Sequence, residues 1–571
     1  MSAPKCHLPC SPIKRLEEAG TSLVAAFKDY LNICHNLGAD LLLQGAKVED
    51  IATGVDSTLE TVYTVMRSHH LDETRYILIR TRNTLTSPFF RFPEEVMSEI
   101  FENAVFDPRD SETSAPLPLS QHIRVIYHRL YNLFGVCSSW RDTIMARQAL
   151  WSVMPMVEGF PTIGRDLFRR VIERAGGSKR YLAVAFERPT FDAMELELSR
   201  VLIDYGPRFS SINIAVDEHS LIQDMINMLL ERGAPHSLSQ LFIQLKNKEP
   251  QAFTIPPLHS GCIIAHSSQE DSFARLISGL TAFRISGITL NWDTLAFSAR
   301  LVELQISHMV LGYDSMLASF MQALSSASEL RDLKLIDVKT YRQVVASDTD
   351  TPLPISFSKL QSIHLEDLCL NTLKALFPMI NLGPHHLTLY LTESSIHHRL
   401  RVNHGDGSFL NRVHITELYT VLRHSPIRTL MISGNQNSDT LWLTGSAFRG
   451  LLEAMPTLKT LKMDFWHFDK AVWTDLNRRN YPRLPALEKL YMTSTIIHST
   501  KGFWGTIASH PLQQVVLGGT VGNSIDGARS REPIQESSSI VQWLQAHVPE
   551  FYLVDDAYRS AEFYLAEWQL W

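Results

Sequence analysis

Hydrophobic residues in the N-terminal part of the chain recur at helical spacing. Between residues 14 and 86, apolar side chains such as Leu23, Phe27 and Leu31 follow one another every three or four residues, which places them on one face of a helix. The charged residues in between are of both signs. The pattern predicts an N-terminal helical lead-in over residues 1–88, acting as a packing element or a short helical pair.

A distinct helix start follows at Pro93. Proline suits the first position of a helix because its missing N–H would be unpaired there, and Glu94 and Glu95 then lie where the helix dipole favours negative charge. The apolar residues that continue at helical spacing are Val96, Met97, Ile100, Phe101 and Ala104. A loop rich in proline and serine (107–119) separates this helix from a second stretch of helical periodicity, 123–151.

Three pieces of this region occur in the order of a known motif: FPEEVMSEIF from Phe92, VCSSWRD from Val136 and ALW from Ala149. The segment from Phe90 to Ser152 therefore resembles the F-box motif, in the form common in fungal F-box proteins. Phe92 and Glu94 stand where the motif usually has a leucine and a second proline, and the stretch before the Cys-Trp helix is longer than typical. The alternative is an ordinary helical hairpin at 89–152 whose aromatic residues only pack.

The resemblance implies a partner. F-box helices dock a Skp-type adaptor and, through it, the cullin of an SCF-type ubiquitin ligase. Apolar and aromatic residues carry most of the binding energy in such contacts. The expected adaptor-binding residues are Phe92, Pro93, Val96, Ile100, Phe101, Val136, Trp140, Leu150 and Trp151. Some of them must instead hold the helices together, and the sequence does not sort the two groups.

The rest of the chain, 153–571, carries a repeat. Segments of the type Leu-x-x-Leu-x-Leu recur, mostly at intervals of roughly 20 to 30 residues, close to the period of leucine-rich repeats. They begin at Leu238, Leu280, Leu301, Leu330, Leu360, Ile427, Leu458, Leu487 and Leu512, with His386–Leu391 as a candidate degenerate unit. Helical spacing lies between them, and each unit has apolar residues on the sides that face its neighbours. The pattern predicts an α/β solenoid: a curved leucine-rich-repeat-like array with a parallel strand layer, resembling the irregular arrays that commonly follow an F-box.

The non-leucine positions of such strands point onto the concave surface, the usual binding face of these arrays. The expected substrate-binding residues are Arg284, Gln305, Lys334, His364, Lys462 and Tyr491. This set is chemically mixed, with neither a basic nor an acidic stripe, which favours a protein partner over a polyanion. The alternative is a sheet face that is merely solvated.

Composition narrows the function further. The 571 residues carry a formal net charge of −7, which gives no electrostatic reason to expect nucleic acid or an acidic membrane surface as a partner. The first twenty residues lack the apolar core of a secretory signal, so the expected location is the cytosol or nucleus. The six cysteines are too scattered for a disulfide framework. Cys6 and Cys10 flank His7, but no second pair completes a zinc site, and neither a metal nor a cofactor is expected.

Motifs for catalysis are absent from the sequence. It contains no G-x-S-x-G elbow, no H-E-x-x-H and no phosphate-binding P-loop, and the glycines at 518, 519 and 522 precede what reads as an open surface loop. The predicted function is a non-enzymatic substrate receptor of a ubiquitin ligase. One alternative is a repeat scaffold whose F-box-like helices serve only as an N-terminal cap. Another is an enzyme of unrecognised type, which would need a polar pocket with shifted pKa values.

Overall fold

A computed structural model describes most of the chain. The described residues are 11–43, 48–67, 69–86, 89, 92–107, 116–158, 171–176, 179–186, 192–231, 237–246, 267–342, 354–380, 383, 385–401, 408–434, 442–525, 528–556 and 558–570. The chain forms two compact units, Met1–Pro93 and Glu94–Trp571. Cys6, His7 and Cys10 lie outside the described residues.

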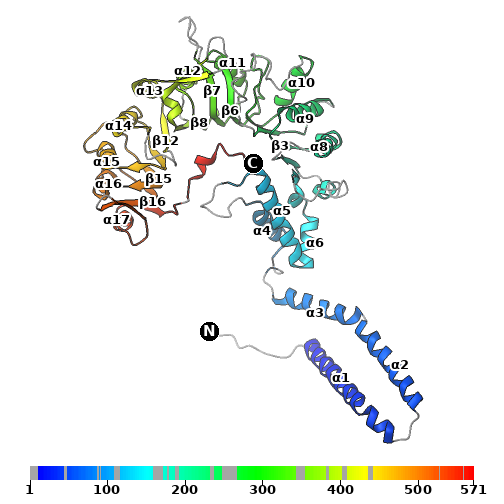
Figure 1. Cartoon of the computed structure of the whole chain (residues 1–571). Helices are drawn as coiled ribbons and strands as arrows, with labels where there is room; N and C mark the ends of the chain where they lie inside the picture. Colours follow the sequence, from blue (N-terminus) through cyan, green and yellow to red (C-terminus); the bar gives the residue numbers. More distant parts are fainter. Residues whose placement is uncertain are drawn as a thin grey trace. The chain divides into compact units, whose positions relative to one another are not determined.

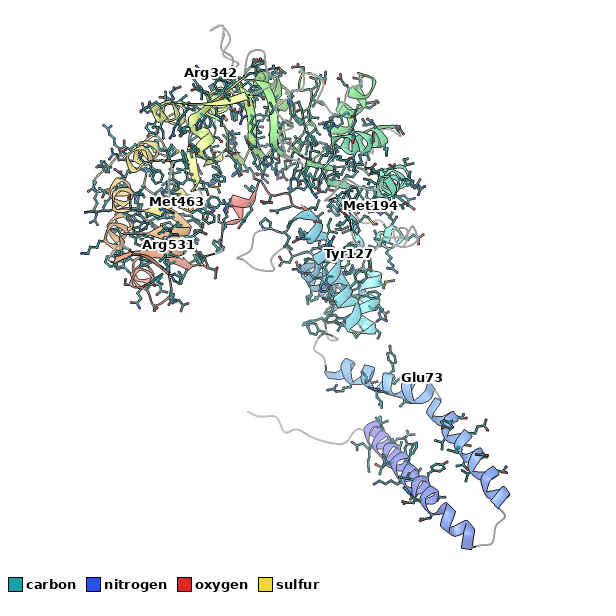
Figure 2. All side chains as sticks on the ribbon, in the orientation of Figure 1. Glu73, Tyr127, Met194, Arg342, Met463 and Arg531 are labelled. Atoms are coloured by element: carbon teal, nitrogen blue, oxygen red, sulfur yellow. The ribbon has the colours of Figure 1, made fainter. Side chains whose placement is uncertain are left out.

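The first unit contains the predicted helices: α1 (Ser11–Leu43), α2 (Val48–Arg67) and α3 (His69–Thr86). Glu73 marks α3 in Figure 2. The face of α1 that the periodicity predicted is bare in the isolated chain, with Leu23, Phe27 and Leu31 exposed by 53, 56 and 57%. Helical spacing therefore predicted the secondary structure of this segment, and among the described residues of the first unit the apolar face of α1 stays exposed.

The second unit begins with four short helical elements: α4 (Glu94–Phe106), α5 (Leu119–Val136), α6 (Ser138–Ala146) and the 3-10 turn η2 (Gln148–Trp151). Pro93 and the two glutamates behind it stand at the start of α4, as the helix-start signal predicted. Helices α4, α5 and α6 contact one another, and α5 also contacts the first two strands of the sheet. The Tyr127 hydroxyl, labelled in Figure 2, donates to the carbonyl of Val153 over 2.6 Å. These helices therefore close the first edge of the sheet.

The sheet contains sixteen strands among the described residues, and its strand order follows the chain. In that order the strands are β1 (Val153–Val157), β2 (Tyr181–Ala185), β3 (Ser211–Val216), β4 (Gln240–Leu245), β5 (Ala282–Ser286), β6 (Glu303–Tyr313), β7 (Asp332–Tyr341), β8 (Ser362–Glu366), β9 (His386–Leu391), β12 (Ile427–Ser433), β13 (Thr460–Asp464), β15 (Lys489–Ile497), β16 (Gln514–Ile525) and β17 (Ala528–Pro533). Two short strands lie off this path: β14 (His467–Phe468) pairs with β15, and β18 (Glu550–Leu553) pairs with β16. Every pairing in this sheet is parallel except that between β16 and β17. The architecture is α/β with a large, mostly parallel sheet.

Successive side chains of each strand point to opposite faces of the sheet, and this alternation explains why the helices cover only one face. The second and fourth positions carry the leucines of the repeat, such as Leu304, Leu333 and Leu335, all of them buried. They face the connecting helices, which lie outside the arc of strands in Figure 1. Those helices are α8 (Asp192–Tyr205), α9 (His219–Glu231), α10 (Ser267–Ile277), α11 (Met316–Leu324), α12 (Leu370–Met379), α13 (Ile415–Leu422), α14 (Gly445–Glu453), α15 (Lys470–Leu476), α16 (Thr500–Ile507) and α17 (Ser539–His547). The opposite face, which lines the inside of the arc, is called the inner face below.

A left-handed residue recurs where the repeated strands bend. It follows the shared five-residue core of the strand in each case: His308, Asp337, Asp367, Phe465 and Ser494, together with Gly287 and Gly519. The backbone N–H of Phe465 still donates to the carbonyl of Thr493 on the next strand, over 3.1 Å. The ladder thus continues through the bend and offsets the conformational cost of a positive φ. At Gly519 a Cβ atom would meet the backbone of Thr495, so only glycine fits.

The predictions for individual segments of the sheet were partly confirmed and partly wrong. The nine predicted repeat segments and the candidate unit His386–Leu391 all coincide with strands. The loop expected after Gly522 was wrong, because β16 and β17 continue there as an antiparallel hairpin. A second hairpin, β10 (His397–Arg401) with β11 (Ser408–Arg412), was not anticipated, and neither were β1, β2 and β3. Those three strands are nearly continuous buried runs without the repeat's alternation.

Candidate protein-binding site

The F-box-like residues divide into a buried group and an exposed group. Phe101, Leu150 and Trp151 are buried, and Trp140 packs against Phe101 with ring centroids 4.9 Å apart. The Trp151 indole N–H donates to the carbonyl of Ile144 over 2.9 Å. These side chains hold the helices together and join them to the sheet.

The remaining expected adaptor contacts are open to solvent. Val96 and Ile100 stand one helical turn apart on α4 and are exposed by 40 and 38%, and Val136 at the end of α5 is exposed by 58%. Phe92 and Pro93, at the end of the first unit, are exposed as well. Large apolar side chains left bare on a folded helix are a common mark of a protein-binding surface.

The six expected substrate-binding residues all lie on the inner face. Arg284, Gln305, Lys334 and His364 are direct neighbours on the consecutive strands β5 to β8. Lys462 and Tyr491 are neighbours on β13 and β15, further along the same face. The sequence pattern therefore identified both the face and the register, and the six residues form two groups.

In the first group, one carboxylate joins two cations. Glu303 accepts two hydrogen bonds from Arg284, over 3.1 and 3.2 Å, and a third from Lys334 over 3.1 Å. Burial opposes ionisation of Glu303, but the two cations outweigh it and hold the pKa of this carboxyl below its ordinary value. The Arg284 guanidinium also lies over the ring of Phe242, 4.6 Å from its centroid. Glu303 offsets one of the two positive charges, so the cluster of Arg284, Glu303 and Lys334 keeps one positive charge in excess.

The other members of the set have partners too. His364 is buried and lies 3.0 Å from Glu366 on its own strand. Gln305 Nε2 lies 3.4 Å from the backbone carbonyl of Leu565. Leu565 belongs to the C-terminal segment, defined here as Asp555–Leu570, which leaves the sheet after β18.

The C-terminal segment returns across the inner face. In Figure 1 it runs inside the arc, and the chain ends near β3. Its described contacts progress from Ser494 on β15, which donates to the carbonyl of Asp556 over 2.8 Å, to Asn213 on β3. Among its described residues, regular structure is confined to one short 3-10 turn, η5 (Ala561–Tyr564). The face expected to receive a substrate is thus occupied by the chain's own end.

The middle of the segment is held by charge and by an aromatic contact. Lys462 is buried, and its ammonium lies 2.6 Å from Glu562 and 4.3 Å from the centroid of the Tyr491 ring. Burial lowers the pKa of Lys462, and Glu562 offsets part of that effect. Phe563 packs edge-on against Tyr390, with ring centroids 5.4 Å apart.

A second charged contact lies two residues along β13 from Lys462, on the same face. Arg559 Nε lies 2.5 Å from Asp464 Oδ2, and Asp464 is fully buried. Burial raises the pKa of Asp464, while Arg559 works in the opposite direction. A buried carboxylate requires such a partner, and Arg559 of the C-terminal segment supplies the opposite charge at Asp464.

The side-chain amide of Asn213, which is buried, binds the end of the segment. Asn213 accepts from the Trp568 indole N–H over 2.7 Å and donates to the carbonyls of Gln569 and Leu570, each over 2.9 Å. Sequence reasoning did not identify Asn213, Tyr390, Asp464 or the segment itself. The available signal was the aromatic run EFYLAEWQLW after the last repeat, which has neither strand nor helix periodicity.

Comparisons with known proteins and a search for other kinds of site add the following. No protein-family model matches the chain, and no curated protein sequence is similar to it. Within the described ranges, no group of three or more histidine, cysteine, aspartate or glutamate side chains is arranged to hold a metal ion. None of the described helices combines the length and apolar character needed to cross a membrane.

Proposed function

We propose that the chain is a non-catalytic substrate receptor of an SCF-type ubiquitin ligase, acting in the cytosol or nucleus. Its F-box-like helices would dock a Skp-type adaptor, and the inner face of the sheet would receive a protein substrate. Its contribution would be positioning, because holding a substrate near the ubiquitin-charged enzyme raises the effective concentration of the reacting lysine.

The observation that carries the adaptor half of this proposal is the division of the F-box-like residues. Phe101 and Trp151 are buried, whereas Val96, Ile100 and Val136 remain exposed although they are large and apolar. These three side chains take no part in the packing that holds the helices together, so they lie in water in the unbound chain. Binding to a partner would remove them from it.

The substrate half rests on the inner face and on the finer fold. We propose that the strand order, the alternation and the recurring left-handed bend make the sheet a leucine-rich-repeat-like solenoid. Stacked repeats leave one continuous strand-lined face for recognition. The mixed charges of Arg284, Glu303 and Lys334 on that face suit a protein surface better than a polyanion.

The test is capture of a purified Skp-type adaptor by the intact chain and by a Val96→Asp, Ile100→Asp double variant. Both positions are exposed, so the variant should stay folded by circular dichroism yet bind at least about tenfold more weakly. The control is Leu196→Asp, which places one aspartate on an exposed leucine of α8 and should bind normally. Failure of the intact chain to bind the adaptor would refute the ligase role.

One alternative has an observation in its favour. The F-box-like helices also close the first edge of the sheet, through α5 and the bond from Tyr127 to Val153. Repeat arrays need such caps, so these helices would be required in a repeat scaffold without any ligase role. The adaptor test separates the two, because a cap alone binds no adaptor.

A further inference from the structure

We propose that the inner face is a groove for an extended segment of a partner protein, and that the C-terminal segment is the chain's own copy of that ligand. The partner segment would carry a glutamate next to an aromatic residue and, further along, a tryptophan. This inference rests on the proposed substrate-binding role of the inner face and specifies the chemistry that the face would select.

The first element of the groove is a carboxylate receptor. Lys462 is buried on β13, beside the Tyr491 ring. Its ammonium lies 2.6 Å from Glu562 and 3.3 Å from the Ser560 hydroxyl, both of them groups of the C-terminal segment. With the C-terminal segment in place this ammonium is buried, and Glu562 supplies the counter-charge that a buried cation requires.

The second element is an aromatic slot. Tyr390 and Met431 are paired neighbours on β9 and β12, and with Phe563 they form an apolar cluster separate from the main core. A phenyl ring from the segment fills the space edge-on against Tyr390. Removing it would leave the apolar surfaces of Tyr390 and Met431 in water.

The third element recognises a tryptophan together with the backbone around it. Asn213 is buried in the middle of β3, where an amide has to find partners for its oxygen and its nitrogen. The indole N–H of Trp568 and two backbone carbonyls supply them. An extended segment satisfies this arrangement, because successive backbone carbonyls must be free to accept.

The C-terminal segment occupies the inner face without forming a strand of the sheet. No described residue after Leu553 is part of a strand. Side chains of the sheet hold the segment by bonds to its side chains and to its backbone carbonyls. The Glu562 side chain remains 47% exposed. Tethering gives the segment an effective concentration in the millimolar range, so a partner with the same three groups competes only when it adds contacts or when the segment is released.

The experiment measures binding of a fluorescein-labelled peptide with the sequence of residues 555–571 by fluorescence anisotropy, using the full-length chain throughout. The intact chain should bind it weakly. A chain whose own segment is loosened by Glu562→Gln, Phe563→Ala and Trp568→Ala should bind it at least about tenfold more tightly. Adding Lys462→Met to the loosened chain should abolish that gain, whereas the control Lys489→Met, at an exposed lysine on the neighbouring strand, should not.

A folded loosened chain that binds the peptide no better than the intact chain would overturn the inference. Hydrogen exchange of the unaltered chain gives a second measurement that depends on no substitution. Peptides from 558–570 should exchange by local opening, faster than those from β3, and equal rates would mean that the segment is a permanent part of the fold. Adaptor capture is independent of both readouts. A chain that captures the adaptor but shows no gain in peptide binding would reject this inference alone. A chain that gains peptide binding but captures no adaptor would reject the ligase role alone.

Discussion

Replacement of Trp151 by alanine tests how the F-box-like helices are joined to the sheet. Trp151 is 2% exposed, its indole N–H donates to the carbonyl of Ile144, and the Arg174 guanidinium lies 4.9 Å from its ring centroid. Truncating a buried tryptophan costs about 3–5 kcal/mol. The carbonyl of Ile144 would lose its partner as well, at about 1 kcal/mol. We therefore expect Trp151→Ala to lower the free energy of unfolding by about 4–6 kcal/mol.

The assay is urea unfolding followed by circular dichroism, with hydrogen exchange as a local readout. The amide of Tyr181 donates to the carbonyl of Ser152, so its protection reports on the chain next to the indole. The control is Val136→Ala at a position 58% exposed, where the change should stay within about 0.5 kcal/mol. A loss below about 1 kcal/mol for Trp151→Ala, with unchanged protection at Tyr181, would refute the view that this indole joins helices and sheet.

Two further predictions concern Glu303 on β6 and Asn371 on α12. Glu303→Gln leaves Arg284 and Lys334 without their carboxylate and should lower the free energy of unfolding by about 1–3 kcal/mol near pH 7. Because the folded chain lowers the pKa of Glu303, that contribution is present above the ordinary glutamate pKa of 4.5 and is lost as the pH falls through the lower folded value. Urea midpoints of the variant and the unaltered chain should therefore converge in acid, and a difference that persists unchanged there would contradict the assignment. Asn371→Ala removes an amide that donates to the Thr340 carbonyl over 2.9 Å, and thermal unfolding should show a loss of about 2 kcal/mol, whereas an unshifted transition would show that water replaces the amide.

The sheet was predictable to the extent that its strands carry the repeat. Leucines such as Leu333 and Leu365 are buried against helices. Because leucines recur at equivalent strand positions, the repeat is visible in the sequence. Arg284 and Lys334 then follow on the inner face by alternation alone. The strand Val153–Val157 lies under the capping helices and is buried throughout, so it shows no alternation that could have revealed it.

The candidate site was only half predictable, for a related physical reason. Periodicity reports which face of an element is buried, but the C-terminal segment is held by single contacts from Arg559, Glu562 and Trp568. Such contacts leave no period in the sequence. The sequence also could not show that Val96 is exposed and Phe101 buried, because both residues are apolar and both lie at helical spacing. Only the packing of α4 against its neighbours distinguishes them.

The bond between Trp568 and Asn213 has a consequence for how the unit unfolds. Because the strands pair in chain order, each end of the sheet is stabilised mainly by its nearest neighbours, and such arrays can melt piece by piece. The bonds from the C-terminal segment to Asn213 join residues up to 357 positions apart and connect the last strands to the third. These bonds connect the two ends of the linear array, so we expect both ends to unfold in one transition. Release of the segment would divide one cooperative transition into two.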